Sequence, residues 1–363
     1  MRAISLPWFG QNGHATVSPE ENYLFTRQLH VLQRSGVPLL SGLHALQQQL
    51  PSAALRRILV DVHQDLLQGR TFSQALARHP RVFGKIYVGL IRVGEAGGIL
   101  DDSLEQLAQL LEWELDLRNR LREALQYPII VLCTLAAALT VMAIFVLPQF
   151  AKMFQSFHIA LPLQTQLLIL ISTIISHFGW LLAILTVVAV VAWQAYIHTE
   201  AGRLRWHTWK LQLPLLGPVF LQLAMSRFAR VTAALNHSGV SILETLALAS
   251  ESVNNSCVQG KLAIVRDRVR GGEPLAGAMK TEPVFPAVVT QMVATGEETG
   301  RLDELLRSVS EYYDQQVAYT LKRLITLLEP LLLLVVGLGV LLMATAVFVP
   351  MWDLVKLFKQ HGG

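Results

Sequence analysis

An apolar stretch without a single charged side chain runs from Pro128 to Pro148. At about 1.5 Å of helix rise per residue, roughly 20 residues cross the ~30 Å hydrocarbon core of a bilayer. A second stretch of the same length, from Pro330 to Pro350, is again uncharged and bounded by prolines. Both stretches are therefore predicted to be transmembrane helices.

A third apolar stretch, Leu167–Ile197, is longer than one bilayer thickness and carries several polar residues in its first half. This pattern predicts an interfacial lead-in followed by a transmembrane helix over residues 176–197. Trp180 lies near one end of that helix, and Trp193 and Tyr196 lie near the other. Aromatic residues at both ends are typical of the two membrane interfaces.

The polar parts of the chain show the spacing of helices that bury one face. Ser18–Glu21 has the pattern of a capping box with proline at the first helical position, and leucines recur at helical spacing over Leu39–Leu50. Glycines at Gly36 and Gly69 are predicted to end helices. No run alternates in the manner of a strand, so the first polar part is predicted to be a bundle of about six helices.

The second polar part repeats the first, which indicates a tandem duplication. Residues of the first part return 203 positions later and, after a one-residue gap, 202 positions later. The matched pairs include Phe25 with Phe228, Arg27 with Arg230, Gly36 with Gly239, Gly69 with Gly272, Phe83 with Phe285, Gly94 with Gly296, Gly98 with Gly300, Asp101 with Asp303, Pro128 with Pro330 and Pro148 with Pro350.

The predicted fold is an all-α membrane protein with two homologous six-helix bundles and three transmembrane helices. In chain order, we expect a short N-terminal tail (1–17), the first bundle (18–127), the first span (128–148), a periplasmic loop with the interfacial lead-in (149–175), the second span (176–197), the second bundle (198–329), the third span (330–350) and a periplasmic tail (351–363).

The orientation follows from Lys and Arg. There are 13 of them over residues 1–127 and 14 over residues 199–329, against Lys152 alone in the first external loop. Because cytoplasmic segments carry the excess of positive charge, both bundles and the N-terminus are predicted to be cytoplasmic and the C-terminus periplasmic. Residues 1–13 lack the continuous apolar region of a cleavable signal, which agrees with this orientation.

Composition supports the membrane assignment, since 52% of residues are hydrophobic, 15% are charged and the mean hydropathy is +0.43. The net charge of +4 is spread through both polar parts and is not interleaved with aromatic residues, so nucleic acid is not an expected partner. Cys133 lies in a span and Cys257 in a polar segment, so no disulfide is expected.

The segments Gly94–Asp101 (GEAGGILD) and Gly296–Asp303 (GEETGRLD) each lead through a long helix to Pro128 or Pro330. Together with the repeats and spans, they resemble the inner-membrane platform proteins of type II secretion systems and of type IV pilus assembly, the PilC family. The resemblance covers residues 18–350. It implies a non-enzymatic homo-oligomer in the bacterial inner membrane, which couples a cytoplasmic hexameric ATPase to polymerisation of pilin or pseudopilin subunits beside other inner-membrane assembly proteins. Pilus, secretion and DNA-uptake machines share this component.

The two Gly-Glu segments are the candidate partner-contact loops, but a turn between helices asks for the same residue types. Left-handed positions favour glycine, and an acid near a helix start serves as an N-cap or first-turn residue. A divalent cation at Glu95, Asp101 and Asp102 is a further alternative. The candidate residues are Gly94, Glu95, Gly98 and Asp101, with Gly296, Glu297, Gly300 and Asp303.

The sequence contains no motif that would indicate catalysis. The chain lacks a Walker lysine motif, Gly-x-Ser-x-Gly, His-Glu-x-x-His and Cys-x-x-Cys, so no cofactor, metal or enzymatic activity is expected. A transporter or channel built from repeats is the alternative function. It is disfavoured because the predicted spans carry no charged residue, although small residues such as Ala136 and Gly339 would allow close helix packing and self-association.

Overall fold

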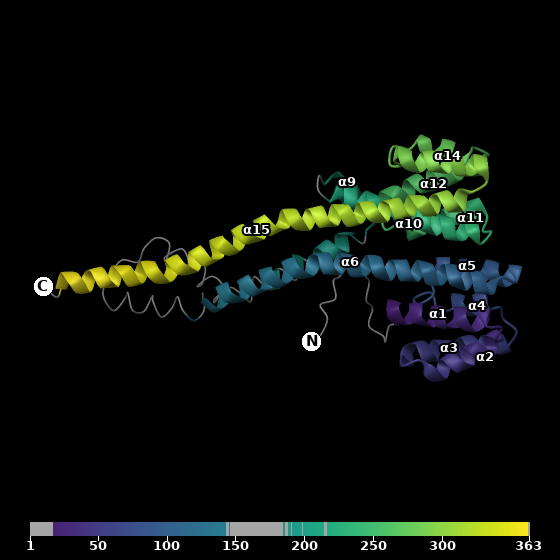
Figure 1. Ribbon diagram of the computed structural model, residues 1–363, viewed down its shortest axis with the longest axis horizontal. Coiled ribbons are helices and arrows are strands. Elements are labelled where there is room, and N and C mark those ends of the chain that lie inside the picture. Colours follow the sequence, from purple (N-terminus) through teal and green to yellow (C-terminus); the bar gives the residue numbers. More distant parts are fainter. Residues whose placement is uncertain are drawn as a thin grey trace. The chain divides into compact units, whose positions relative to one another are not determined.

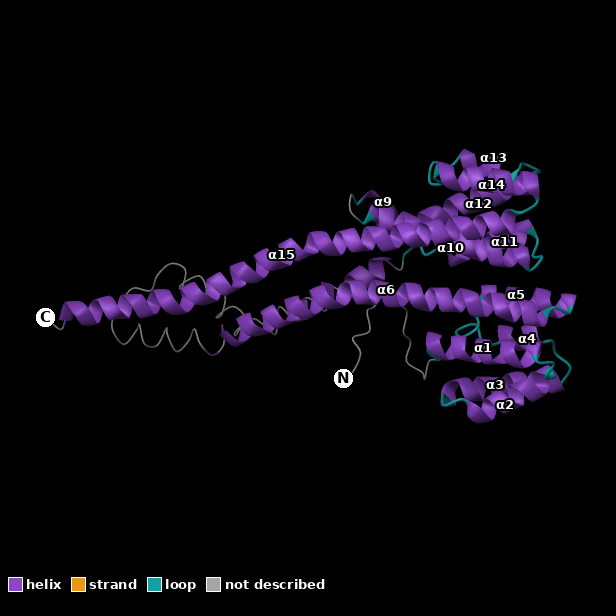
Figure 2. Ribbon diagram, in the orientation of Figure 1, coloured by secondary structure: helices purple, strands orange, loops and turns teal. Residues whose placement is uncertain are grey.

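The computed structural model describes residues 17–142, 145, 184–185, 188–189, 191–197, 199–213 and 216–361. Within these residues every regular element is a helix, and no strand occurs, which confirms the predicted all-α class (Figure 2). The predicted tail before residue 17, the loop at 149–175 and much of the span at 176–197 lie outside the described residues.

The first repeat folds into helices whose limits follow local sequence signals. They are α1 (Pro19–Arg34), α2 (Leu39–Gln49), α3 (Ala53–Leu67), α4 (Phe72–Ala77), α5 (Lys85–Gly97) and α6 (Leu100–Val141). The predicted capping box is confirmed, because Glu21 N–H donates to Ser18 Oγ at 3.1 Å and Ser18 N–H donates to Glu21 Oε2 at 3.0 Å. Gly36 and Gly69 follow α1 and α3 with φ of 77° and 83°.

The second repeat follows the same order. After α9 (Glu200–Gln212) come α10 (Gly217–His237), α11 (Ile242–Ser252), α12 (Ser256–Arg270), α13 (Leu275–Lys280), α14 (Ala287–Thr299) and α15 (Leu302–His361). Gly239 and Gly272 take the same left-handed conformation as Gly36 and Gly69, with φ of 82° and 92°. Figure 1 shows α1 to α5 beside the first part of α6, and α10 to α14 beside the first part of α15.

An aromatic pair lies at the centre of each repeat. The rings of Phe25 and Phe83 are 6.1 Å apart, and those of Phe228 and Phe285 are 6.2 Å apart. All four side chains are buried. The duplication therefore preserves core geometry as well as residue identity.

The chain divides into two compact units. One consists of residues 1–119 and 211–317, and the other of residues 120–210 and 318–363. Helices α6 and α15 continue from the first unit into the second, so neither Pro128 nor Pro330 ends a helix. Only 6% and 11% of the most apolar windows of these two helices are buried by protein, and both helices are long and apolar enough to cross a membrane.

Within the second unit, α6 and α15 approach one another closely at Gly339. A Cβ atom at this glycine would lie 2.8 Å from Leu135 Cδ1, whereas one at Gly337 would meet nothing within 4 Å. The absence of a side chain at Gly339 thus lets the two helices of one chain pack together. The close helix packing predicted for Gly339 therefore occurs between two helices of the same chain.

Candidate functional site

The two Gly-Glu segments lie at the α5–α6 and α14–α15 turns, and these turns are shorter than the sequence suggested. Gly94 and Glu95 belong to the last turn of α5, which ends at Gly97. Gly98 follows in the left-handed conformation, with φ of 69°, and Gly300 matches it at 70°. The predicted left-handed glycines are therefore confirmed, but the glutamates are helical residues and not part of a loop.

Glu95 caps the start of α4, a helix that precedes it by more than 20 residues. The N–H groups of Phe72 and Ser73 donate to its two carboxylate oxygens at 2.5 Å and 3.1 Å, and Ser73 Oγ donates at 2.8 Å. The N–H groups in the first turn of a helix have no partner within the helix, and the helix dipole favours a negative charge beside them. Glu95 thus stabilises α4 with both oxygens.

Glu297 repeats this arrangement at the start of α13. Leu275 N–H and Ala276 N–H donate to its two oxygens at 2.6 Å and 2.8 Å. The N-cap residue of α13 is Pro274, which offers no side-chain hydrogen bond. Glu297 is therefore the side chain that meets the first N–H groups of this helix.

Gly94 and Gly296 allow the helix after each turn to pack against the helix before it. A Cβ atom at Gly94 would lie 2.3 Å from Ser103 Oγ and 2.6 Å from Ser103 Cβ, on the first turns of α6. At Gly296 it would lie 2.9 Å from Leu302 Cα on α15. Contacts this short do not occur between real atoms, so both positions exclude any larger residue unless the helices separate.

The two aspartates are first-turn acids, as predicted. Asp101 lies in the first turn of α6, and its carbonyl oxygen is 3.1 Å from His30 Nδ1 on α1. Asp303 lies in the first turn of α15, with a carboxylate oxygen 2.8 Å from His237 Nδ1 on α10. The hydrogen bond from His237 lowers the pKa of the Asp303 carboxyl.

The divalent-cation alternative finds no support in this geometry. Glu95 directs both oxygens at α4, whereas Asp101 and Asp102 lie on the first turn of α6. Among the residues that the structure describes, no group of three His, Cys, Asp or Glu side chains is placed to hold a metal ion.

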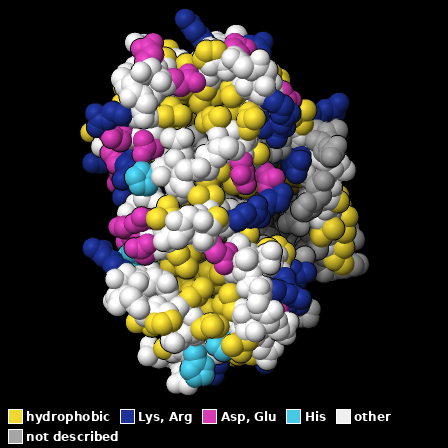
Figure 3. All heavy atoms as spheres, turned by 90° about the vertical axis from the view of Figure 1, so that its right-hand side faces the viewer, with side chains coloured by type: hydrophobic (Ala, Val, Ile, Leu, Met, Phe, Trp, Pro, Cys, Tyr) yellow, Lys and Arg dark blue, Asp and Glu magenta, His cyan; other side chains and the backbone are white. Residues whose placement is uncertain are grey.

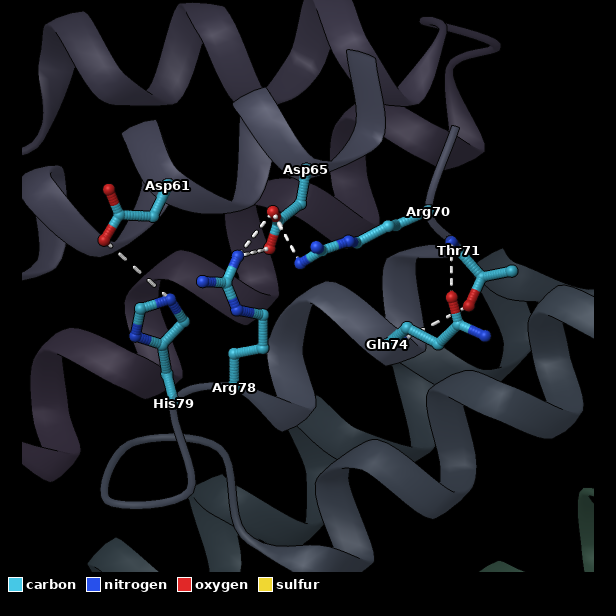
Figure 4. Close-up of polar contacts among 7 residues, drawn as sticks. All are labelled: Asp61, Asp65, Arg70, Thr71, Gln74, Arg78 and His79. Carbon is cyan, nitrogen blue, oxygen red and sulfur yellow. Dashed lines mark hydrogen bonds and ion pairs between the residues drawn. The ribbon is translucent and has the colours of Figure 1, made fainter. Parts of the chain in front are cut away.

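Helix α4 is also held at its C-terminal end, by an ion cluster around Asp65 (Figure 4). Asp65 on α3 is buried, and Arg78, the C-cap residue of α4, donates to both of its oxygens at 2.5 Å and 2.6 Å. Arg70 donates to Asp65 at 3.0 Å. In the second repeat Arg268 stands at the position of Asp65, so the glutamate cap is retained by both repeats and the ion cluster is not.

A polar junction between the repeats was not predicted. Asp314 on α15 accepts hydrogen bonds from the indole N–H of Trp113 on α6 at 3.0 Å and 3.1 Å, and from Arg230 at 2.7 Å. Ser226 Oγ donates to the same carboxylate at 2.5 Å. The guanidinium of Arg230 lies 5.1 Å from the Trp113 ring centre. The signal available in the sequence was the Arg27–Arg230 match, whose first member pairs with exposed Glu112 at 3.8 Å.

Lys, Arg, Asp and Glu side chains of the described residues are mixed on the face at the right-hand side of Figure 1. Figure 3, which views the molecule from the right-hand side of Figure 1, shows acidic and basic side chains interspersed with apolar ones. A surface of this kind suits contact with a mixed protein surface better than binding to nucleic acid.

Comparison with known proteins finds the duplication again. A family model described as "Type II secretion system (T2SS), protein F" matches residues 25–148 and, a second time, residues 228–350. The two matches begin at the core residues Phe25 and Phe228 and end at Pro148 and Pro350. The internal repeat is therefore confirmed as two copies of one family domain.

Curated relatives match over nearly the whole chain. The "Type 4 fimbrial assembly protein PilC" of Pseudomonas putida is 37% identical over 92% of this chain and 83% of its own length. The "Type IV pilus assembly protein PilC" of Thermus thermophilus is 34% identical over 92% and 82%. The "Type II secretion system protein F" of Pseudomonas aeruginosa is 29% identical over 96% and 87%.

Proposed function

Because the chain belongs to the type II secretion system protein F family, we propose that it couples a cytoplasmic assembly ATPase to the polymerisation of pilin or pseudopilin subunits. Family membership supports a platform protein of type IV pilus or type II secretion machinery in the inner membrane. The observation that carries the proposal is the double family match, since both repeats of a two-domain platform are present with the long helices that follow them.

The proposed topology has three spans and two cytoplasmic bundles of six helices each. The lopsided Lys and Arg content supports a cytoplasmic N-terminus and a periplasmic C-terminus. We propose the bundles at 18–127 and 198–329, and the spans at 128–148, 176–197 and 330–350. The transporter alternative would need polar groups near the bilayer midplane, and the sequences of these first and third spans contain no charged residue.

The two Gly-Glu turns are proposed to act on partner contact indirectly. Their glutamates are occupied by the starts of α4 and α13, so they fix the position of these short helices. Helices of six residues have little stability of their own and depend on such tertiary contacts. We therefore place the partner contact on the surfaces that the turns hold in place, and the chemistry in the ATPase.

The test of the proposed function is extraction of the tagged full chain from its native membrane in mild detergent, followed by identification of the proteins that co-purify. We expect an ATPase together with pilin-like subunits, and the identity of those subunits would name the machine. Recovery of the chain alone, repeated after chemical cross-linking, would argue against a platform and redirect attention to transport assays in liposomes.

Replacement of either glutamate should weaken assembly without preventing membrane insertion. Glu95→Ala and Glu297→Ala each remove a carboxylate that accepts two backbone N–H groups, at a cost of about 1–3 kcal/mol. Helix α4 keeps its own N-cap, Thr71, in the first variant. We expect native amounts of both variants in the membrane fraction and reduced fibre assembly or secretion. Glu298→Ala is the matched control, because the first repeat already has Ala96 at this position. Normal assembly by both variants at native abundance would show that the turns have no part in function.

A further inference from the structure

The two repeats of one chain pack against each other through α5 and α11. Lys85 Nζ lies 2.7 Å from a Glu251 carboxylate oxygen, and Arg92 lies 3.9 Å from Glu244. As α5 advances from 85 to 92, its partners on α11 step back from 251 to 244, so the two helices run in opposite directions. The two ion pairs are exposed and add little stability, but their spacing defines the direction and the register of the contact.

The centre of this contact is apolar and close. A Cβ atom at Gly89, midway between the two basic residues of α5, would lie 3.0 Å from Leu248 Cδ1 on α11. The internal repeat gives each of these residues a counterpart. Gln291 on α14 is equivalent to Gly89, and Ala45 on α2 is equivalent to Leu248.

A second part of the same interface joins α6 of the first repeat to α10 of the second. Leu110 and Trp113 on α6 are buried, and so are Ala233 and Ala234 on α10. Leu110, Arg230 and the two alanines line one small open pocket, so these residues of α6 and α10 lie near one another. In this interface, α5 and α6 of the first repeat therefore pack against α10, α11 and α15 of the second repeat.

Helix α14, the counterpart of α5, is buried on one side, but the side equivalent to the α5 contact is exposed among the residues that the structure describes. On α14, Val288 is 44% exposed and Met292 is 37% exposed, and neighbouring Gln291 is also exposed. No charged residue occurs on α14 before Glu297. The positions of Lys85 and Arg92 are taken by Ala287 and Ala294, so the face is apolar and uncharged where α5 is basic.

Helices α2 and α1, the counterparts of α11 and α10, also carry exposed apolar side chains. Helix α2 contains no Asp, Glu, Lys or Arg, and its Leu40 is exposed. On α1, Leu24 and Val31 are 50% and 55% exposed, at the positions of Arg227 and buried Ala234 on α10. Leu24, Val31 and Leu40 therefore supply exposed apolar area on the two helices that are equivalent to α10 and α11.

The second repeat also has a counterpart for the α6 contact. Tyr312 on α15 is 43% exposed and stands at the position of buried Leu110, and exposed Gln315 stands at the position of Trp113. The side-chain amide of Gln315 can donate a hydrogen bond, as the indole of Trp113 does. The acceptor equivalent to Asp314 is Glu112, which is exposed beside Arg27.

We propose that a second copy of this chain covers these faces, in the way that the second repeat covers the first within the chain. Helix α14 of one copy packs on α2 of the next, with Gln291 against Ala45, and Tyr312 and Gln315 of α15 pack on the exposed face of α1. The two exposed counterpart faces described above are thus each used once. The contact is head to tail, because the surface used on one copy differs from the surface used on its neighbour.

Charge separates the two kinds of contact. The contact inside the chain pairs a basic helix with an acidic one. The contact between copies pairs α2, which has no Asp, Glu, Lys or Arg, with the part of α14 before Glu297, which has none either. Packing α5 of one copy onto α2 of another would leave Lys85 and Arg92 without their acids. This difference favours the intended partner at each face.

This proposal rests on the proposed function, in which the chain associates with itself as a platform protein. Cross-linking tests it separately from the co-purification of the ATPase and pilin-like subunits. Cys133 and Cys257 are first replaced by serine. Two differently tagged copies of the full chain, one with Ala45→Cys and one with Gln291→Cys, are then co-expressed and treated in native membranes with a short bis-maleimide. We expect a dimer that carries both tags. Each cysteine is shown beforehand to react with a monofunctional maleimide.

The controls distinguish head-to-tail packing from other arrangements. Val60→Cys, at an exposed position on α3 outside the proposed interface, should give no dimer with Gln291→Cys. Dimers formed by Ala45→Cys with itself, or by Gln291→Cys with itself, would indicate a symmetric contact and overturn the proposal. Absence of the mixed dimer would overturn it too, whether or not the two tags still co-purify.

A charged substitution gives an independent reading of the same contact. Met292→Glu would bury a carboxylate against α2, so recovery of the second tag should fall about tenfold. Ile264→Glu, at an apolar residue of similar exposure on α12, is the matched control and should leave recovery unchanged. Equal recovery with Met292→Glu and with the wild-type chain would exclude α14 from the interface.

Discussion

Replacing Asp314 with alanine is expected to lower the apparent midpoint of thermal unfolding of the detergent-solubilised chain by roughly 6–12 °C, which corresponds to about 3 kcal/mol. The carboxylate accepts hydrogen bonds from Trp113, Arg230 and Ser226. Its removal leaves a guanidinium and an indole N–H at the junction between the repeats without their acceptor. Groups that lose a partner in a largely buried site cost more than the bond itself contributed.

Two further variants separate the junction from a general effect of charge on α15. Glu311→Ala removes an exposed acid one turn earlier and should change stability by less than about 0.5 kcal/mol. Asp314→Asn keeps an oxygen acceptor but loses the ion pair with Arg230, so its effect should lie between the two. If Asp314→Ala and Glu311→Ala unfold at the same temperature, this carboxylate does not hold the repeats together.

Much of the fold could be predicted because its signals are local. The capping box before α1 needs only Ser18 and Glu21 at the right spacing, and the glycines that end α1 and α3 act through their own φ angles. The duplication was equally accessible, since matching residues such as Phe25 and Phe228 keep a constant offset. Both features are specified by the residue types and their spacing, and the structure agrees with them.

The roles of the candidate site residues depend on contacts that the sequence does not encode locally. An acid after a glycine at the end of a helix is compatible with solvent, a partner or a cap. That Glu95 turns back to Phe72 and Ser73 follows from the packing of α4 beside α5. The duplication held a usable clue, because an acid retained in both repeats while Asp65 is not retained points to a role within each repeat.

The junction between the repeats was hidden for a different reason. Trp113 and Asp314 are 201 positions apart and are not equivalent residues of the two repeats, so the constant offset does not align them. The residue equivalent to Trp113 is Gln315, and the one equivalent to Asp314 is Glu112. Aligning the two repeats matches equivalent residues only. An interface that joins non-equivalent residues of the two repeats therefore leaves no signal in that alignment.

Gly94→Ala is expected to destabilise the first repeat by about 2 kcal/mol, although alanine favours helix over glycine by about 1 kcal/mol. The added Cβ atom would lie 2.6 Å from Ser103 Cβ, which a change of side-chain rotamer cannot move. Helices α5 and α6 must therefore separate. Thermal unfolding of the full chain in detergent, at one scan rate for all variants, measures the effect.

Alanine substitutions at two neighbouring glycines separate the effect of steric contact from the effect of backbone conformation. Gly98→Ala meets no atom within 4 Å but forces alanine to a φ of 69°, at a cost of about 1 kcal/mol. Gly97→Ala brings its nearest contact only to 3.4 Å, at a helical position where the second repeat has Thr299, so it should be neutral or slightly stabilising. The expected order of destabilisation is Gly94, then Gly98, then Gly97. If Gly94→Ala proves as mild as Gly97→Ala, the close contact of α5 with α6 does not constrain the turn, and the glycine shared with Gly296 has another origin.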